Sequence, residues 1–134
     1  MHTTFTVRTS SRTTMVNITR DVERAASELG VKDGALLVYC PHTTGAITIN
    51  ESADPAVVTD IDSKLCRVAP HSDGYRHSEG NSDAHVKSSL VGCSETVLVS
   101  NGALVLGRWQ GVFFCEFDGP RTRSVIVGTL GSAD

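Results

Sequence analysis

The sequence has little surplus charge of either sign: twelve Lys and Arg residues stand against fifteen Asp and Glu residues, which gives a formal net charge of −3 at pH 7. Proteins that bind nucleic acid usually carry a clustered basic surplus, so we expect no nucleic-acid partner. No apolar run approaches the roughly 20 residues of a membrane-spanning helix. Thr and Arg also interrupt the N-terminal segment, where a signal peptide would be apolar. We therefore expect no membrane partner and a cytoplasmic location.

The sequence also lacks closely spaced cysteines. Its four cysteines, Cys40, Cys66, Cys93 and Cys115, form no CxxC pair, which excludes the usual redox and zinc-binding spacings. Cys40 and Cys115 lie inside apolar segments that resemble strands. We expect these two to be buried, reduced thiols that pack as small hydrophobic side chains.

Low-complexity linkers, internal repeats and charge blocks are absent as well. A chain of 134 residues without such boundaries fits one domain, and we expect a single domain over residues 1–134. A domain near this size buries roughly two thirds of its unfolded surface, which is enough for a hydrophobic core without stabilising disulfides.

Three segments carry the capping residues and apolar periodicity of a helix. They are residues 20–29, capped by Thr19 and ended by Gly30; residues 55–68, with Asp54 as cap and Pro55 in the first turn; and residues 82–91, capped by Asn81 or Ser82 and ended by Gly92. The second helix has an apolar face made of Val57, Val58, Ile61, Leu65 and Val68.

About seven strands are expected between and after these helices. Their approximate ranges are 5–8, 35–40, 46–49, 96–99, 104–106, 109–117 and 124–130. Asn101 and Gly102 separate two apolar runs, which is the strongest short signal of a hairpin. Tight turns between strands indicate a mainly antiparallel sheet, with the helices packed against it as a group. The predicted fold class is α+β.

One polar segment, residues 77–85, contains more polar side chains than the start of a helix needs. It contains two imidazoles, two carboxylates, a carboxamide, two hydroxyls and a glycine, whereas one side chain is enough for capping. Asn81 and His85 are one helical turn apart and face the same way, His77 can fold back, and the helix N-terminus favours anions. The alternative is a well-capped helix with two exposed histidines.

A second polar segment follows the strand that ends at Cys40. His42, Thr43 and Thr44 precede Gly45, and catalytic or binding groups favour loops held by rigid strands. The alternative is a simple turn with one surface histidine. Glu51 ends the next strand, where it could serve as a metal ligand, as a general acid or base, or in a salt bridge. We predict that the two polar segments meet.

Together the histidines and carboxylates could bind a divalent metal. Imidazole from His42, His77 and His85 suits Zn²⁺, whereas carboxylates such as Asp83 and Glu51 suit Mg²⁺ or Mn²⁺. The spacing matches no standard zinc motif. The two remaining histidines, at positions 2 and 71, are expected at the surface.

A third group of residues follows the sole tryptophan. Trp109 is expected in a core or an interface. Glu116 and Asp118 alternate with an apolar residue and so share one face of a strand. They could serve acid–base chemistry, but ion pairs with Arg121 and Arg123 are the interpretation we favour. The two arginines could also bind phosphate oxygens.

These segments resemble the YjbQ family, described as secondary thiamine-phosphate synthases. The resemblance spans nearly the whole chain, in the family's order, and rests on Pro41–Gly45, Ile49–Glu51, Asp54-Pro55, Gly80–Gly92, Leu106–Gly111 and Glu116–Arg121. Residues 99–102 replace a segment that usually begins with a proline-bearing strand, and Arg108 stands where Thr is common. Neither departure touches the polar segments.

The resemblance implies a sandwich-like α+β subunit, a homotrimer and a small phosphorylated substrate. It implies synthesis of thiamine phosphate from a pyrimidine diphosphate and a thiazole phosphate. It also implies that His42, His77, Asn81, Asp83 and His85 are the family's characteristic polar positions. Together with the residue chemistry above, we expect catalytic roles for His42, Asp83, His85 and Glu51, ligand contacts from Thr43, Thr44, Asn81, Lys87 and Arg121, and a divalent metal, Zn²⁺ or Mg²⁺, on His42, His77 and His85. The alternatives are a non-catalytic module for a metal or phosphometabolite and a hydrolase that uses the same histidines.

Overall fold

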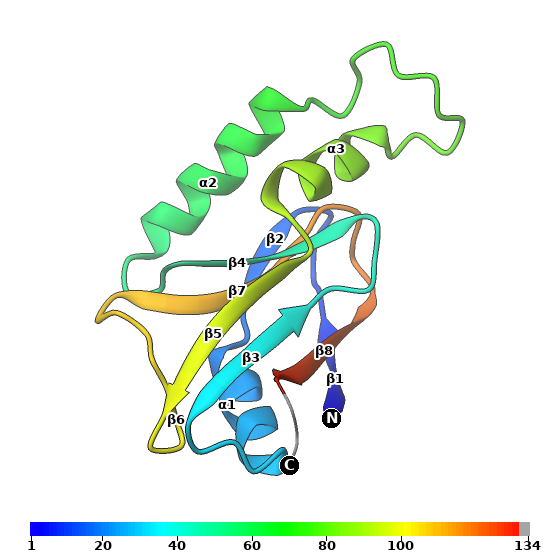
Figure 1. Cartoon of the computed structure of the whole chain (residues 1–134). Coiled ribbons are helices and arrows are strands. Elements are labelled where there is room, and N and C mark those ends of the chain that lie inside the picture. Colours follow the sequence, from blue (N-terminus) through cyan, green and yellow to red (C-terminus); the bar gives the residue numbers. More distant parts are fainter. Residues whose placement is uncertain (132–134) are drawn as a thin grey trace.

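The computed structural model describes residues 1–131, so the last three residues of the expected domain lie outside the described part. Within it, eight strands form two antiparallel sheets (Figure 1). The five-stranded sheet has the order β1 (His2–Arg8), β8 (Thr122–Leu130), β3 (Gly34–Tyr39), β5 (Ser94–Ser100) and β6 (Ala103–Leu104). The three-stranded sheet has the order β2 (Thr14–Asn17), β7 (Gln110–Glu116) and β4 (Gly45–Glu51). With three helices, this arrangement confirms the predicted α+β class.

Strand β7 lies between two hydrophobic cores, because both of its faces are buried. Val112 and Phe114 point into a core shared with the five-stranded sheet and helix α1 (Thr19–Glu28). Phe113 and Cys115 point the opposite way, into a second core that is covered by helices α2 (Pro55–Val68) and α3 (Ser82–Val91). The helices therefore do not form one group as expected. Figure 1 shows α2 and α3 together on one side and α1 at the other end.

Helix α1 begins one residue earlier than predicted, and Thr19 is its first residue rather than its cap. The side chain of Asn17 takes the capping role: its Oδ1 accepts a hydrogen bond from the Thr19 backbone N–H at 3.0 Å and another from the Thr19 hydroxyl at 2.6 Å. The hydroxyl oxygen of Thr19 in turn accepts from the N–H of Val112 at 2.9 Å. These bonds fix α1 to the centre of the three-stranded sheet.

Helix α2 begins as predicted, because Asp54 Oδ1 accepts from the N–H of Ala56 at 2.9 Å and Pro55 opens the first turn. Its apolar face is less covered than the periodicity suggests. Among residues 55–68 none is fully buried; the partly buried side chains Val58, Ile61 and Leu65 pack against the second core. Val68 is 56% exposed.

The predicted hairpin is present. Asn101 and Gly102 have φ angles of 51° and 76°, and Ser100 pairs with Ala103 across the turn. Positive φ at both central residues is what a two-residue turn of this hand requires. Strand β2, in contrast, was not predicted, because its two apolar residues, Met15 and Val16, are adjacent and do not alternate with polar residues.

The cysteines behave as expected. All four thiols are free, and Cys40 and Cys115 are each 1% exposed. Burial raises the pKa of the Cys115 thiol to about 12 and also raises the pKa of Cys40. Trp109 is not in a core: it is 54% exposed, with the Arg108 guanidinium 4.6 Å from the centre of its ring, and its place in an interface stays a prediction.

Candidate functional site

The two polar segments meet at one end of the molecule. A cavity of about 380 Å³ lies between the loop that precedes β4, the loop that enters α3 and the loop that joins β7 to β8. It is lined by Thr43, Thr44, His77, Glu79, Asn81, His85, Asp118 and Arg121. A neighbouring cavity of about 530 Å³ shares Thr43 and His85 and extends along α3 to Cys93. His85 and Thr43 therefore line both spaces.

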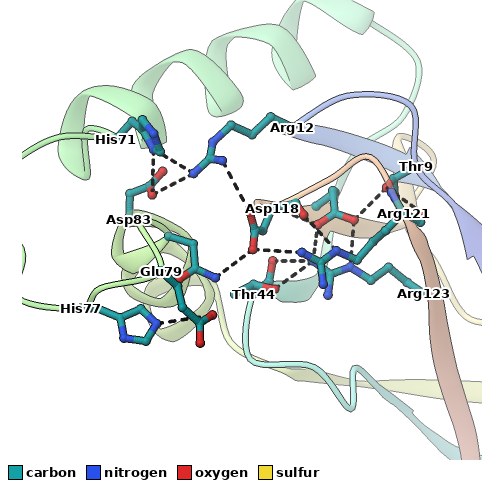
Figure 2. A network of polar contacts seen from close by, with 12 residues as sticks. Thr9, Arg12, Thr44, His71, His77, Glu79, Asp83, Asp118, Arg121 and Arg123 are labelled. Atoms are coloured by element: carbon teal, nitrogen blue, oxygen red, sulfur yellow. Dashed lines mark hydrogen bonds and ion pairs between the residues drawn. The ribbon is translucent and has the colours of Figure 1, made fainter.

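His77 and His85 form the imidazole pair of the cavity. Their ring centres are 5.5 Å apart and the rings are nearly perpendicular, at 89°. Nε2 of His77 lies 3.7 Å from a carboxylate oxygen of Glu79, which is itself 72% exposed. Figure 2 shows His77 and Glu79 on the loop that leads into α3. His77 is exposed and His85 is partly buried, so solvent can reach the pair.

His42 is not among the residues that line this cavity. Its Nε2 accepts a hydrogen bond from the backbone N–H of Ser124 at 2.9 Å, and its ring packs edge-on against Phe114. Burial lowers the pKa of His42, and the positive charge of Arg123 lowers it further. The lone pair that accepts from Ser124 would be lost on protonation, so this geometry holds the ring neutral and leaves only Nδ1 for other contacts.

Asn81 stands before the first residue of α3 but does not cap the helix through its side chain. Its Nδ2 donates instead to Asp118 Oδ2 at 2.9 Å, and the same oxygen accepts from Arg121 at 3.0 Å (Figure 2). Within the described part of the chain, Asn81 Oδ1 is a buried oxygen without a hydrogen-bond partner. Such an acceptor costs free energy until a donor reaches it.

Asp83 and Lys87, both expected in the site, are buried behind it. Their side chains are 1% and 2% exposed, with Nζ 3.3 Å from Oδ2. Asp83 Oδ1 also accepts from Arg12 at 3.1 Å and lies 3.3 Å from Nδ1 of His71. Burial raises the pKa of Asp83, but the hydrogen bond from Lys87 and the charges of Lys87 and Arg12 outweigh it, so the pKa is lowered. Through Arg12, Asp83 connects the start of α3 to the turn between β1 and β2.

Glu51 lies at the far end of β4. Gly45, next to the cavity, pairs with Glu116, whereas Glu51 pairs with Gln110 at the other end of the same ladder. At about 3.3 Å per residue, the seven-residue strand separates them by roughly 20 Å. One carboxylate oxygen of Glu51 accepts from the N–H of Ala53 at 3.1 Å, so its role within this chain is to shape the loop before α2.

A buried ion pair supports the floor of the site. Glu116 and Arg123 are 0% and 2% exposed and form a salt bridge, and Nη2 of Arg123 also donates to the Thr44 hydroxyl at 2.9 Å. Burial raises the pKa of Glu116, yet hydrogen bonds from Arg123, the Asp118 N–H and Thr9 outweigh it, so the pKa is lowered. The structural role that we favoured for Glu116 and Arg123 is confirmed in this geometry.

Three contributors were missed at the sequence level. Thr9 donates to Glu116 Oε1 at 2.8 Å, and Arg12 joins Asp83 to Asp118, with Nη1 3.5 Å from Asp118 Oδ1. Both come from the turn between β1 and β2, about 100 residues before Glu116, and no local pattern identifies them. Glu79 lies inside the polar segment and could have been considered a candidate. Its place in the cavity wall depends on the path of the loop before α3, which the sequence does not reveal.

The predicted metal ligands are not assembled within one chain. Among residues 1–131, no three His, Cys, Asp or Glu side chains are grouped closely enough to hold a metal ion. His77 and His85 are neighbours, but Nε2 of His42 is bound to the Ser124 N–H.

The described helices include none that is long and apolar enough to cross a membrane.

The fold and site define a single-domain α+β protein with a histidine-lined cavity where two loops meet the start of a helix. The sequence profile of the family described as "UPF0047 protein YjbQ-like" matches residues 3–132. The chain belongs to this family.

Relatives support the assignment along the whole length. The chain is 51% identical to UPF0047 protein YugU of Bacillus subtilis over 96% of this chain and 98% of that protein. It is 50% identical to UPF0047 protein MJ1081 of Methanocaldococcus jannaschii over 95% and 92% of the two chains. A crystal structure of a YjbQ/UPF0047-family protein from Clostridium acetobutylicum superposes with a TM-score of 0.93 at 48% identity, covering 96% of this chain and 99% of that one.

Proposed function

We propose that the cavity binds a small phosphorylated substrate and that the protein acts as a thiamine-phosphate synthase, joining a pyrimidine diphosphate to a thiazole phosphate. The observation that carries the proposal is the meeting of the imidazole pair His77–His85 with Arg121 and Thr43 in one cavity. Guanidinium and hydroxyl groups suit phosphate oxygens, and imidazole titrates near neutral pH.

The proposed reaction breaks the bond between the pyrimidine methylene carbon and the diphosphate oxygen, and the thiazole nitrogen forms the new bond to that carbon. The electron pair of the broken bond leaves with the diphosphate. Arg121, which is 48% exposed and pairs with Asp118, can turn toward this developing charge. His85 supplies a proton to the leaving group.

Zn²⁺ or Mg²⁺ binding stays a separate proposal. The donor set that we expected, His42, His77 and His85, does not fit a metal within one chain, because Nε2 of His42 accepts from the Ser124 N–H. No step of the reaction is therefore assigned to a metal. Metal analysis of the purified protein, before and after treatment with a chelator, tests whether a divalent ion binds at all.

Arg121→Met is the variant that tests substrate binding. We expect it to weaken the binding of the pyrimidine diphosphate about tenfold or more, because a charged hydrogen bond contributes about 1.5–3 kcal/mol. Titration calorimetry measures the affinity, and chromatographic detection of thiamine phosphate measures turnover. Arg20→Met removes an exposed arginine on α1 and serves as the control.

Three results separate the candidate functions. Thiamine phosphate formed by the wild-type protein supports the synthase. Tight binding of both substrates without product supports a non-catalytic binding module. Release of diphosphate from the pyrimidine substrate alone, with no coupled product, supports a hydrolase that uses the same histidines.

We also propose that the protein is a cytoplasmic homotrimer. Support for the assembly comes from the outer face of the five-stranded sheet, where Tyr39, Leu98 and Leu130 are 39%, 59% and 47% exposed. The register places Ala35 between Leu98 and Leu130, so the three strands present one continuous apolar surface. Such patches usually mark interaction sites. The four free cysteines fit a reducing compartment.

Leu98→Asp should convert the trimer into monomers, because it places a charge within this apolar surface. Sedimentation velocity at micromolar concentration measures the change. Leu90→Asp, on α3 and also 59% exposed, is the matched control and should remain trimeric. A wild-type protein that sediments as a monomer would contradict the assembly, and dissociation of the control alone would place the interface on α3 instead.

A further inference from the structure

Lys87 and Cys66 form a pair between two helices that the proposed reaction does not use. Nζ of Lys87, on α3, donates to Sγ of Cys66, on α2, at 3.6 Å. The Lys87 side chain is 2% exposed, whereas Cys66 is partly exposed. A thiol that solvent can reach therefore contacts an amine that solvent cannot reach.

The surroundings restrict what this amine can react with. Its one charged partner among the described residues is Asp83, at 3.3 Å, and the ammonium points between Asp83 and the sulfur atom. The other partly or fully exposed thiol, Cys93, lies after α3 beside the second cavity. Because the amine already lies 3.6 Å from the sulfur, an oxidised Cys66 would meet Lys87 before it met a thiol of another molecule.

We propose that Cys66 and Lys87 are a redox-sensitive modification site, at which a peroxide produces a direct covalent bond between Sγ and Nζ. In the first step the thiol attacks the peroxide: the O–O bond breaks, sulfur is oxidised to a sulfenic acid, and hydrogen peroxide is reduced to one water. In the second step the Lys87 nitrogen attacks sulfur and displaces the hydroxyl group as a second water. The ammonium gives up two protons, one to this water and one to solvent.

The second step follows known sulfur chemistry, since a sulfenic acid condenses with a nearby nitrogen to a sulfenamide. The overall change removes two hydrogens from the protein for each peroxide consumed. Two equivalents of a small thiol reverse it, because they restore the Cys66 thiol and the Lys87 amine and leave as a disulfide. The crosslink is therefore a reversible modification rather than irreversible oxidative damage.

The link would change the molecule in two ways. It would join α2 covalently to α3, the helix that covers the same sheet (Figure 1). Residues 55–68 of α2 bury no side chain fully, so the link would add an anchor to this helix. It would also remove the positive charge of Lys87, so that among residues 1–131 Asp83 would keep Arg12 and His71 as neighbours. Asp83 and Asn81 both lie at the start of α3, and Asn81 lines the cavity. A change in the redox state of Cys66 would therefore alter the contacts that position the cavity wall.

Peptide mapping of the full-length protein tests the proposal directly. After treatment with a small excess of hydrogen peroxide, we expect one crosslinked pair of peptides that contain Cys66 and Lys87, lighter by two hydrogens than their sum and separated again by dithiothreitol. Cys66→Ser and Lys87→Arg should each abolish the crosslink, while Cys93→Ser should leave it unchanged.

Two results would overturn the proposal. One is oxidation of Cys66 to sulfenic or sulfinic acid with no link to Lys87. The other is a disulfide between Cys66 and another cysteine as the main product. Both are read from the wild-type protein, so the test does not depend on whether Lys87→Arg folds.

Discussion

Arg123→Met is expected to lower the free energy of unfolding by about 3–5 kcal/mol at pH 7, because it leaves the Glu116 carboxylate buried without its cation. Glu116 and Arg123 are 0% and 2% exposed, and Arg123 also holds the Thr44 loop through the hydroxyl and the carbonyl. Methionine keeps much of the side-chain volume, so the loss reports the charge and its hydrogen bonds rather than a cavity. Denaturant unfolding followed by circular dichroism gives the measurement.

The pH dependence identifies the cause. In the wild-type protein the pKa of Glu116 lies below its ordinary value of 4.5, so its contribution to stability is present above about pH 4.5 and is lost as the pH falls through the lowered pKa. Without Arg123, burial favours the protonated acid instead. The difference between wild type and variant should therefore shrink as the pH falls below 4.5.

Arg24→Met is the matched control. Arg24 pairs with Asp21 at 3.1 Å, but its side chain is 64% exposed, so the change should cost less than about 1 kcal/mol. Two results would contradict the assignment of Glu116–Arg123 as a buried ion pair that stabilises the fold. One is an equal loss of unfolding free energy in the two variants, and the other is a loss for Arg123→Met that does not change with pH.

Local signals in the sequence were sufficient where a few neighbouring residues decide the structure. Asp54 and Pro55 start α2 through one capping bond, and Asn101-Gly102 makes its turn from two backbone conformations. Burial is different, because it depends on what packs against an element. The apolar stripe of α2 predicted a helix correctly, but the chain supplies only partial cover for it.

The same distinction between local and long-range determinants applies to the candidate site. Asn81 and His85 could be placed together because one helical turn joins them. The direction of the His42 ring could not be predicted, since it is fixed by the N–H of Ser124, 82 residues later. Lys87 looked like a ligand group because it follows the polar segment, yet its position on α3 turns it inward, toward Asp83 and Cys66. Ala84 is 0% exposed, whereas Val86, two residues later on the same helix, is 41% exposed.

His85→Ala is expected to lower the rate of thiamine-phosphate formation by about 10²–10⁴-fold, which is the usual loss when a general acid is removed. His85 lines both cavities and contacts His77, so it is placed to reach a bound substrate. The fold should persist. The side chain is only partly buried, and alanine has the higher helix propensity, so the melting temperature should hold or rise slightly.

The control and the stability measurement distinguish catalysis from packing. His2→Ala changes an exposed histidine at the opposite end of β1 from the cavity and should leave turnover unchanged. His85→Asn keeps a polar side chain of similar reach but has no group that titrates near neutral pH, so it should lose as much activity as His85→Ala. If His85→Ala instead melts clearly lower and still forms product and binds the pyrimidine diphosphate normally, His85 is a packing residue. In that case the proton must come from another group in the cavity, and His77 is the next to test because its ring lies 5.5 Å away and is open to solvent.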